Sequence, residues 1–130
     1  MKRQYTDKHA IAGINTVMPE LETFPNQYKN YIITIDIPEY SSICPKSGLP
    51  DCGKLVIRYI PDKKCMELKS LKYYILAFRN LGIFYENATN KIFSDFIKAV
   101  KPKGAYIKGD FTPRGGISTS VEVFYGKPVK

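Results

Sequence analysis

The sequence predicts an α+β domain in which an antiparallel four-stranded sheet carries two helices on one face. The chain has 130 residues, a length that suits one domain with one hydrophobic core. Segments with the β-branched content and alternation of strands occur in the first half and near the C-terminal end, and two segments with helical spacing lie between them. Strands grouped before and after the helices are typical of α+β domains. The predicted order over residues 1–130 is therefore β-β-α-α-β-β, in a single domain.

The N-terminal half is predicted to contain an arm and the first two strands. Residues 1–28 show little periodicity and are interpreted as the arm. Residues 31–37 are rich in β-branched side chains and predict a strand that ends at Pro38. Residues 41–51 contain two prolines and a glycine, which predicts an irregular loop. The second strand is predicted over residues 55–60.

The C-terminal half is predicted to contain both helices and the last two strands. Apolar residues at helical spacing predict one helix over residues 71–78, stopping near Gly82, and another over residues 92–100. Strands are predicted over 105–111 and 117–125. A sheet with helices on one face has open edges and a second face to cover. Self-association through the sheet edges is therefore expected.

The charge balance is strongly basic, with 20 Lys and Arg against 12 Asp and Glu, a net charge of +8. This excess favours an anionic partner, such as a phosphorylated cofactor, a nucleic acid or an acidic surface. The alternative is a soluble basic surface with no specific partner. The basic residues form no block of like charges, so a nucleic-acid-binding tail is not indicated.

The sequence shows no targeting, disulfide or metal-binding pattern. No apolar run approaches the roughly 18 residues of a membrane span, and residues 1–20 lack the apolar core of a signal peptide. A cytoplasmic protein without membrane association is expected. Three cysteines are an odd number and form no CxxC motif, and the only histidine is His9. Neither a disulfide framework nor a metal site is predicted.

The leading candidate nucleophile is Cys44, which lies in the loop between the first two predicted strands. Asp51 follows seven residues later, across the turn. A carboxylate repels a thiolate, so Asp51 suits proton transfer better than thiolate stabilisation. The alternative is that a single loop cysteine is structural. Cys52 and Cys65 have no comparable setting and are interpreted as packing residues.

Two short stretches are candidate anion-binding sites. Lys69 and Lys72 lie one helical turn apart with Ser70 between them, where free helix N–H groups could meet a phosphate; a solvated basic face is the alternative. Arg114 is followed by two glycines, which let backbone N–H groups approach a ligand; the alternative is a plain hairpin turn. Glu86 either stabilises a helix start or accepts hydrogen bonds from a guanine-like ring edge.

Taken together, these motifs resemble the unimodular 7-cyano-7-deazaguanine reductases, nitrile reductases of queuosine biosynthesis (a tRNA modification) in the tunnelling-fold superfamily. The resemblance includes Cys44-Pro-Lys-Ser-Gly-Leu-Pro-Asp51 and Glu67-Leu-Lys-Ser-Leu-Lys-Tyr-Tyr74. The second stretch fits the signature that distinguishes this family from other tunnelling-fold enzymes. The matching segments follow the family order: residues 24–26, 44–51, 59–62, 67–74, 78–80 and 111–118.

The resemblance implies an oxidoreductase mechanism. The Cys44 thiolate would add to the nitrile carbon to give a covalent thioimide, with Asp51 as the general acid and NADPH as the source of two hydrides. Family members form homo-oligomers, pentameric rings stacked into decamers, with active sites between subunits. The implied substrate-binding residues are Met66, Glu67, Leu68, Tyr85 and Glu86. The implied NADPH-binding residues are Lys69, Ser70, Lys72, Arg114 and Gly115.

The sequence departs from the family pattern at three places. Tyr85 stands where the family usually has histidine, residues 52–54 replace the usual Phe-Ala-Thr, and Ala88 stands where some relatives have a second cysteine. Two alternatives therefore stay open. One is a nitrile-to-amidine transferase acting on tRNA, as in the archaeosine-forming relatives. The other is a non-catalytic purine-binding relative.

Overall fold

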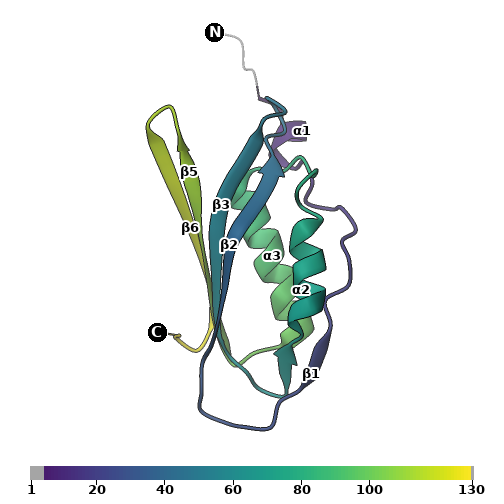
Figure 1. The fold of residues 1–130 in the computed structure, drawn as a ribbon, viewed down its shortest axis with the longest axis vertical. Coiled ribbons are helices and arrows are strands. Elements are labelled where there is room, and N and C mark those ends of the chain that lie inside the picture. The colour runs from purple at the N-terminus through teal and green to yellow at the C-terminus, as the bar shows by residue number, and fades with distance from the viewer. Residues whose placement is uncertain (1–4, 130) are drawn as a thin grey trace.

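The computed structural model describes residues 5–129, which form two antiparallel sheets and three helices (Figure 1). The main sheet has the strand order β2-β3-β5-β6, and a small sheet pairs β1 with β4. In chain order the elements are α1 (Asp7–Ala10), β1 (Thr23–Pro25), β2 (Ile33–Ile43), β3 (Pro50–Ile60), β4 (Lys64–Met66), α2 (Leu68–Leu76), α3 (Tyr85–Val100), β5 (Gly104–Arg114) and β6 (Ile117–Gly126).

The predicted α+β architecture is confirmed. Each neighbouring pair in the main sheet is antiparallel, and α2 and α3 lie on one side of this sheet (Figure 1). Strands β2 and β6 form the two edges within the described chain. The core lies between the sheet and the helices, where Ile57, Phe96 and Ile107 are fully buried. Alternate residues of β3 and β5 face the helices, as the two-residue strand period requires.

The described part of the N-terminal arm, residues 5–28, contains two short elements that its sequence did not indicate; residues 1–4 lie outside the described chain. Residues 7–10 form a single helical turn, and β1 pairs with β4 through Thr23↔Met66. The pairing was not visible in the sequence because three-residue strands carry too few residues to show a period. The arm also packs closely on the body: a Cβ added to Gly13 would lie 2.5 Å from the Gly82 carbonyl oxygen.

The predicted end of the first strand at Pro38 is also wrong. Strand β2 continues through this proline to Ile43, and β3 begins at Pro50. Strand β2 is a sheet edge, where a residue without an N–H can be tolerated, and the ladder changes register between Ile37 and Tyr40. The irregular segment is therefore limited to residues 44–49. This shorter loop places Cys44 and Asp51 at the ends of two paired strands.

Both helices begin before their apolar stripes, and the start of α3 lies one residue before Glu86, where a helix start is expected from the sequence. Helix α2 starts at Leu68 and α3 at Tyr85, because their first turns carry polar and exposed side chains that add little to the stripe. No helix in the described part of the chain is long and apolar enough to span a membrane.

Candidate active site

The Cys44 loop is a tight connection held by its own backbone. The Cys44 N–H donates to the Leu49 carbonyl oxygen at 2.9 Å, and the Gly48 N–H donates to the Cys44 carbonyl oxygen at 3.0 Å. Gly48 has a φ of +73°, in the left-handed region that favours glycine. Ile43, just before the loop, also exchanges backbone hydrogen bonds with Leu81 and Ile83. These bonds hold the connection between α2 and α3 against the base of the loop.

The Cys44 side chain is nearly buried, with 8% of its surface exposed. Burial, the largest influence, raises the pKa of the thiol, and the nearby Asp51 carboxylate raises it further. Hydrogen bonds from the Ser47 hydroxyl and from the backbone N–H groups of Ser47 and Lys46 outweigh both and lower the pKa below its ordinary value. The loop therefore favours the thiolate, the nucleophilic form of cysteine.

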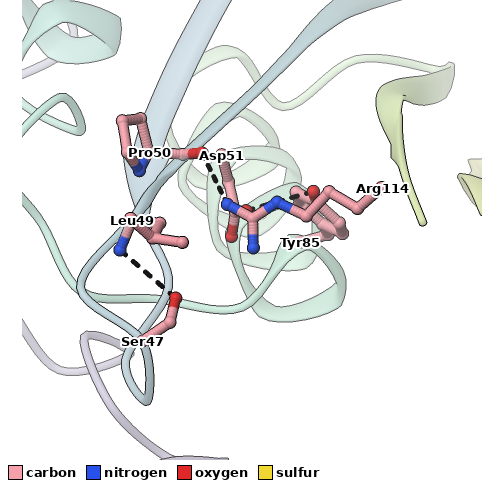
Figure 2. Close-up of polar contacts among 6 residues, drawn as sticks. All are labelled: Ser47, Leu49, Pro50, Asp51, Tyr85 and Arg114. Atoms are coloured by element: carbon pink, nitrogen blue, oxygen red, sulfur yellow. Dashed lines mark hydrogen bonds and ion pairs between the residues drawn. The ribbon is translucent and has the colours of Figure 1, made fainter.

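Asp51 lies at the start of β3 and is 4% exposed. Its Oδ1 atom accepts two contacts: the Arg114 guanidinium nitrogen at 2.8 Å and the Tyr85 hydroxyl at 3.1 Å (Figure 2). The same Arg114 nitrogen donates to the Pro50 carbonyl oxygen at 2.7 Å. A buried carboxylate needs such partners, because an unpaired buried charge is strongly unfavourable. We call Cys44, Asp51, Tyr85 and Arg114 the catalytic cluster, because a catalytic role is proposed for them below.

Tyr85 enters the cluster as the first residue of α3. Its ring stacks on Phe111 with the ring centroids 4.2 Å apart, and its hydroxyl points at Asp51 (Figure 2). Burial and then the Asp51 carboxylate raise the pKa of the Tyr85 phenol. The phenol therefore stays protonated near neutral pH and acts as a hydrogen-bond donor. Glu86, the next residue, is exposed.

Sequence reasoning missed two buried hydroxyl groups beside this cluster. Ser42 is the direct cross-strand partner of Asp51, and Tyr40 precedes it on the same face of β2. Both side chains are essentially inaccessible, at 0% and 2% exposure. The available signal was the two-residue spacing of Tyr40, Ser42 and Cys44, but it was lost once β2 was expected to end at Pro38.

The remaining predicted substrate residues lie at the other end of the domain. Met66 and Leu68 flank the passage from β4 into α2, beyond the end of β3 that is distant from Cys44. Strand β3 has eleven residues, which span roughly 33 Å at about 3.3 Å per residue. Figure 1 shows the β2–β3 turn at the upper end and β1 at the lower end. The fold therefore does not bring Met66, Glu67 and Leu68 together with Cys44 of the same chain.

The start of α2 is already capped by its own sequence. The Glu67 carboxylate accepts hydrogen bonds from the Lys69 and Ser70 N–H groups, each at 2.8 Å, and these bonds lower the pKa of Glu67. The Ser70 hydroxyl is buried; it donates to the Glu67 carbonyl oxygen and accepts from the Glu22 N–H. Neither these N–H groups nor the Ser70 hydroxyl is available to a phosphate, contrary to the predicted anion site.

Exposed cations remain as candidates for a phosphorylated cofactor. Lys69 and Lys72 are exposed one turn apart on α2, and Arg114 lies at the opposite end with its side chain 43% exposed. Gly115 is exposed beside Arg114 with a φ of +57°. These groups suit phosphate oxygens, but one chain holds them at two separate ends. Residues 5–129 contain no cluster of His, Cys, Asp and Glu that could hold a metal ion. We call residues 67–72 the α2 start.

A comparison with solved structures agrees with the fold. A solved structure titled as the archaeosine synthase QueF-Like in the apo form superposes with a TM-score of 0.71 at 18% identity, covering 78% of this chain and 100% of that one. This match confirms the tunnelling fold, and at that identity it shows the fold alone.

Sequence relatives show the family. The sequence model of the family described as QueF-like protein matches residues 50–130. The NADPH-dependent 7-cyano-7-deazaguanine reductase of Elusimicrobium minutum is 54% identical over 95% of this chain and 94% of its own length. The proteins of the same name from Chloroherpeton thalassium and Chlorobaculum tepidum are 60% and 51% identical, each over 82% of this chain and over 95% and 93% of their own lengths. The chain therefore belongs to the family of QueF-like proteins that includes these reductases.

Proposed function

We propose that this chain is a cytoplasmic NADPH-dependent nitrile oxidoreductase that reduces 7-cyano-7-deazaguanine to 7-aminomethyl-7-deazaguanine for queuosine biosynthesis. The observation that carries the proposal is a thiol with a lowered pKa beside a buried carboxyl group. It occurs in a chain that is 54% identical to a protein with this named activity. The whole chain acts as one catalytic domain.

Cys44 and Asp51 perform the covalent step. The Cys44 thiolate forms a carbon–sulfur bond to the nitrile carbon, and one π electron pair of the nitrile moves to its nitrogen. Protonated Asp51 gives its proton to that nitrogen, which yields a neutral thioimide and an aspartate carboxylate. Reduction to the amine takes up two hydrides and two protons in all, and it breaks the carbon–sulfur bond to regenerate the Cys44 thiolate. Asp51 must therefore regain a proton during each turnover.

The exposed cations would hold the cofactor. Bound NADPH would supply the hydrides, and Lys69 and Lys72 of one subunit with Arg114 and Gly115 of another would bind its phosphates. Arg114 contacts Asp51 and Pro50 in the structure described here, so it would exchange these contacts for the cofactor. Ser70, the remaining predicted cofactor residue, would have to exchange its hydrogen bonds with Glu22 and Glu67 to bind the cofactor.

The complete site would form between subunits. The catalytic cluster of one chain would meet Met66, Glu67 and Leu68 of a neighbour, which pairs the two ends that one chain keeps apart. Glu86, exposed beside Tyr85, is suited to accept hydrogen bonds from the guanine-like edge of the substrate. The open edges of β2 and β6 suit association into pentameric rings that stack into a decamer.

The direct test is NADPH oxidation with 7-cyano-7-deazaguanine. Two NADPH should be consumed per nitrile, and Cys44→Ala should reduce the rate to background. Mass spectrometry of the protein with substrate and no cofactor should show an adduct on Cys44, with Cys52→Ala as the control that retains it. The absence of NADPH oxidation would refute the reductase.

An adduct without oxidation would favour the amidine transferase, which ammonia-dependent conversion of nitrile-bearing tRNA would then establish. Loss of both would favour a purine-binding relative.

A further inference from the structure

Two hydroxyl groups beneath the catalytic cluster are buried without hydrogen-bond partners. Within residues 5–129, the Tyr40 and Ser42 hydroxyl oxygens are the buried side-chain polar atoms that have no such partner. The Ser42 hydroxyl lies close enough to Tyr40 to lower its pKa, but the pair lacks the geometry of a full hydrogen bond. An unpaired buried hydroxyl lowers stability relative to an apolar group of the same shape. Two such groups side by side therefore call for an explanation.

Both hydroxyls belong to the immediate surroundings of Asp51. Ser42 faces Asp51 across the β2–β3 ladder, and directly paired side chains lie about 4.5–5.5 Å apart at their Cβ atoms. Tyr40 pairs with Gly53 across the β2–β3 ladder, so no side chain of β3 lies directly opposite the Tyr40 side chain. Burial raises the pKa of Tyr40, and the Asp51 carboxylate raises it further, so Tyr40 and Asp51 are close enough to interact.

Of the two described side chains that contact Asp51, Arg114 suits only its ionised state, whereas the Tyr85 hydroxyl can serve both protonation states. The Arg114 contact and the Tyr85 contact both go to Oδ1, and Arg114 can only donate. A protonated Asp51 needs an acceptor for its own O–H, whereas an ionised Asp51 needs donors. A hydroxyl group can serve both states, because rotation about its C–O bond converts it from donor to acceptor. Asp51 is too buried for bulk water to fill this role freely.

We propose that Tyr40 and Ser42 are positioning residues that hydrogen-bond the Asp51 carboxyl group in both of its protonation states. The proposal rests on the proposed function, in which Asp51 loses and regains a proton in each turnover. It applies most directly when Arg114 leaves Oδ1 for the cofactor, since the carboxyl group then loses its charged partner. In the structure neither hydroxyl bonds Asp51, so the proposed hydrogen bonds require a rotation of the Asp51 side chain or a bridging internal water.

The kinetic test compares Ser42→Ala, Tyr40→Phe and the double variant with the wild-type protein. Each single change should lower kcat about tenfold, while KM for NADPH and for the nitrile stays within twofold. Because each change removes an unpaired buried hydroxyl, the melting temperature should stay the same or rise. Ser42→Thr, which restores a hydroxyl, should recover part of kcat. The matched controls Ser41→Ala and Tyr106→Phe remove hydroxyls outside the buried layer and should leave kcat unchanged.

The pH dependence gives a second readout that needs no turnover. The charged or titrating groups that face Asp51 are Cys44, Tyr40, Tyr85 and Arg114, from β2 and its loop, α3 and β5. In the Arg114→Ala background, the ¹³C resonance of the Asp51 carboxyl should change at a higher pH once both hydroxyls are removed. The reason is that a hydrogen bond donated to a carboxylate is stronger than one to a neutral acid.

Separate outcomes overturn the two proposals. Wild-type protein that oxidises no NADPH refutes the proposed function alone, and the ¹³C titration then still decides the role of the hydroxyls. Variants that match the wild type in both kcat and Asp51 titration refute the positioning role. So do variants that lose kcat only in proportion to a lowered melting temperature, because the hydroxyls would then be structural.

Discussion

The catalytic cluster and the α2 start differ in how completely one chain organises them. Cys44 and Asp51 of the cluster are buried, and the ion pair and hydrogen bond of Asp51 connect residues from β3, α3 and β5. The α2 start uses its polar groups for its own cap and presents only exposed lysines. The difference suggests a division of roles. The proposed reactive groups, Cys44 and Asp51, are already positioned without a ligand, whereas the proposed binding groups, Lys69 and Lys72, would be ordered only by a ligand or a second subunit.

The strongest test of the catalytic cluster is Asp51→Asn, which keeps the shape of the side chain but removes its ability to give up a proton. We expect kcat to fall by roughly 10² to 10⁴, the range that general acid catalysis contributes. The same change removes the carboxylate that raises the pKa of Cys44, so the thiol should be alkylated at lower pH than in the wild type. Stopped-flow kinetics and an iodoacetamide pH series measure the two effects.

Asp110→Asn, on the outer sheet face, is the control. Wild-type turnover in Asp51→Asn would contradict the assignment.

The separation of the two ends predicts complementation between inactive subunits. A one-to-one mixture of Cys44→Ala chains with Lys69→Glu/Lys72→Glu chains, refolded together, should recover about a quarter of wild-type activity, because random pairing joins the two intact ends at one site in four. A mixture of Cys44→Ala with Asp51→Asn should recover none, since both residues come from the same chain. No recovery in the first mixture would place the complete site within one subunit, whereas recovery in the second would show that Cys44 and Asp51 act from different chains.

The α2 start should divide into binding residues and structural ones. Lys69→Ala with Lys72→Ala should raise KM for NADPH about tenfold with little change in kcat, since two exposed charges are lost. Ser70→Ala should leave KM unchanged but lower the free energy of unfolding by about 1–3 kcal/mol, because the Glu22 N–H loses its partner. Steady-state kinetics and urea denaturation measure these effects, with Lys98→Ala as the charge control. A raised KM in Ser70→Ala would return this serine to the cofactor site.

The smallest expected effect is a change in the pKa of the Cys44 thiol when the Ser47 hydroxyl is removed from the loop. Ser47 lowers the pKa of Cys44 through both its hydroxyl and its backbone N–H, and Ser47→Ala removes only the hydroxyl. The pKa of the thiol should therefore rise, and the alkylation rate, which follows the thiolate fraction, should increase at a higher pH than in the wild type. Ser41→Ala is the matched control. An unchanged alkylation profile would show that the backbone N–H groups alone stabilise the thiolate.

Much of the architecture could be predicted because it depends on local patterns. Apolar spacing correctly indicated two helices, and alternation indicated the strands of an antiparallel sheet. The errors occurred where tertiary position overrides local preference. Pro38 lies within a strand because β2 is a sheet edge, and β1 forms because β4 is available to pair with it.

The sequence by itself determined that Cys44 and Asp51, the proposed reactive pair, lie near each other, because one short loop joins them at the end of a hairpin. Only the tertiary structure brought Tyr85 and Arg114 onto Asp51, buried Tyr40 and Ser42 beside it, and placed Glu67 at the far end. Local spacing carries information about faces and turns over a few residues. Contacts between distant strands and helices depend on register and on burial across the whole core, which no local pattern encodes.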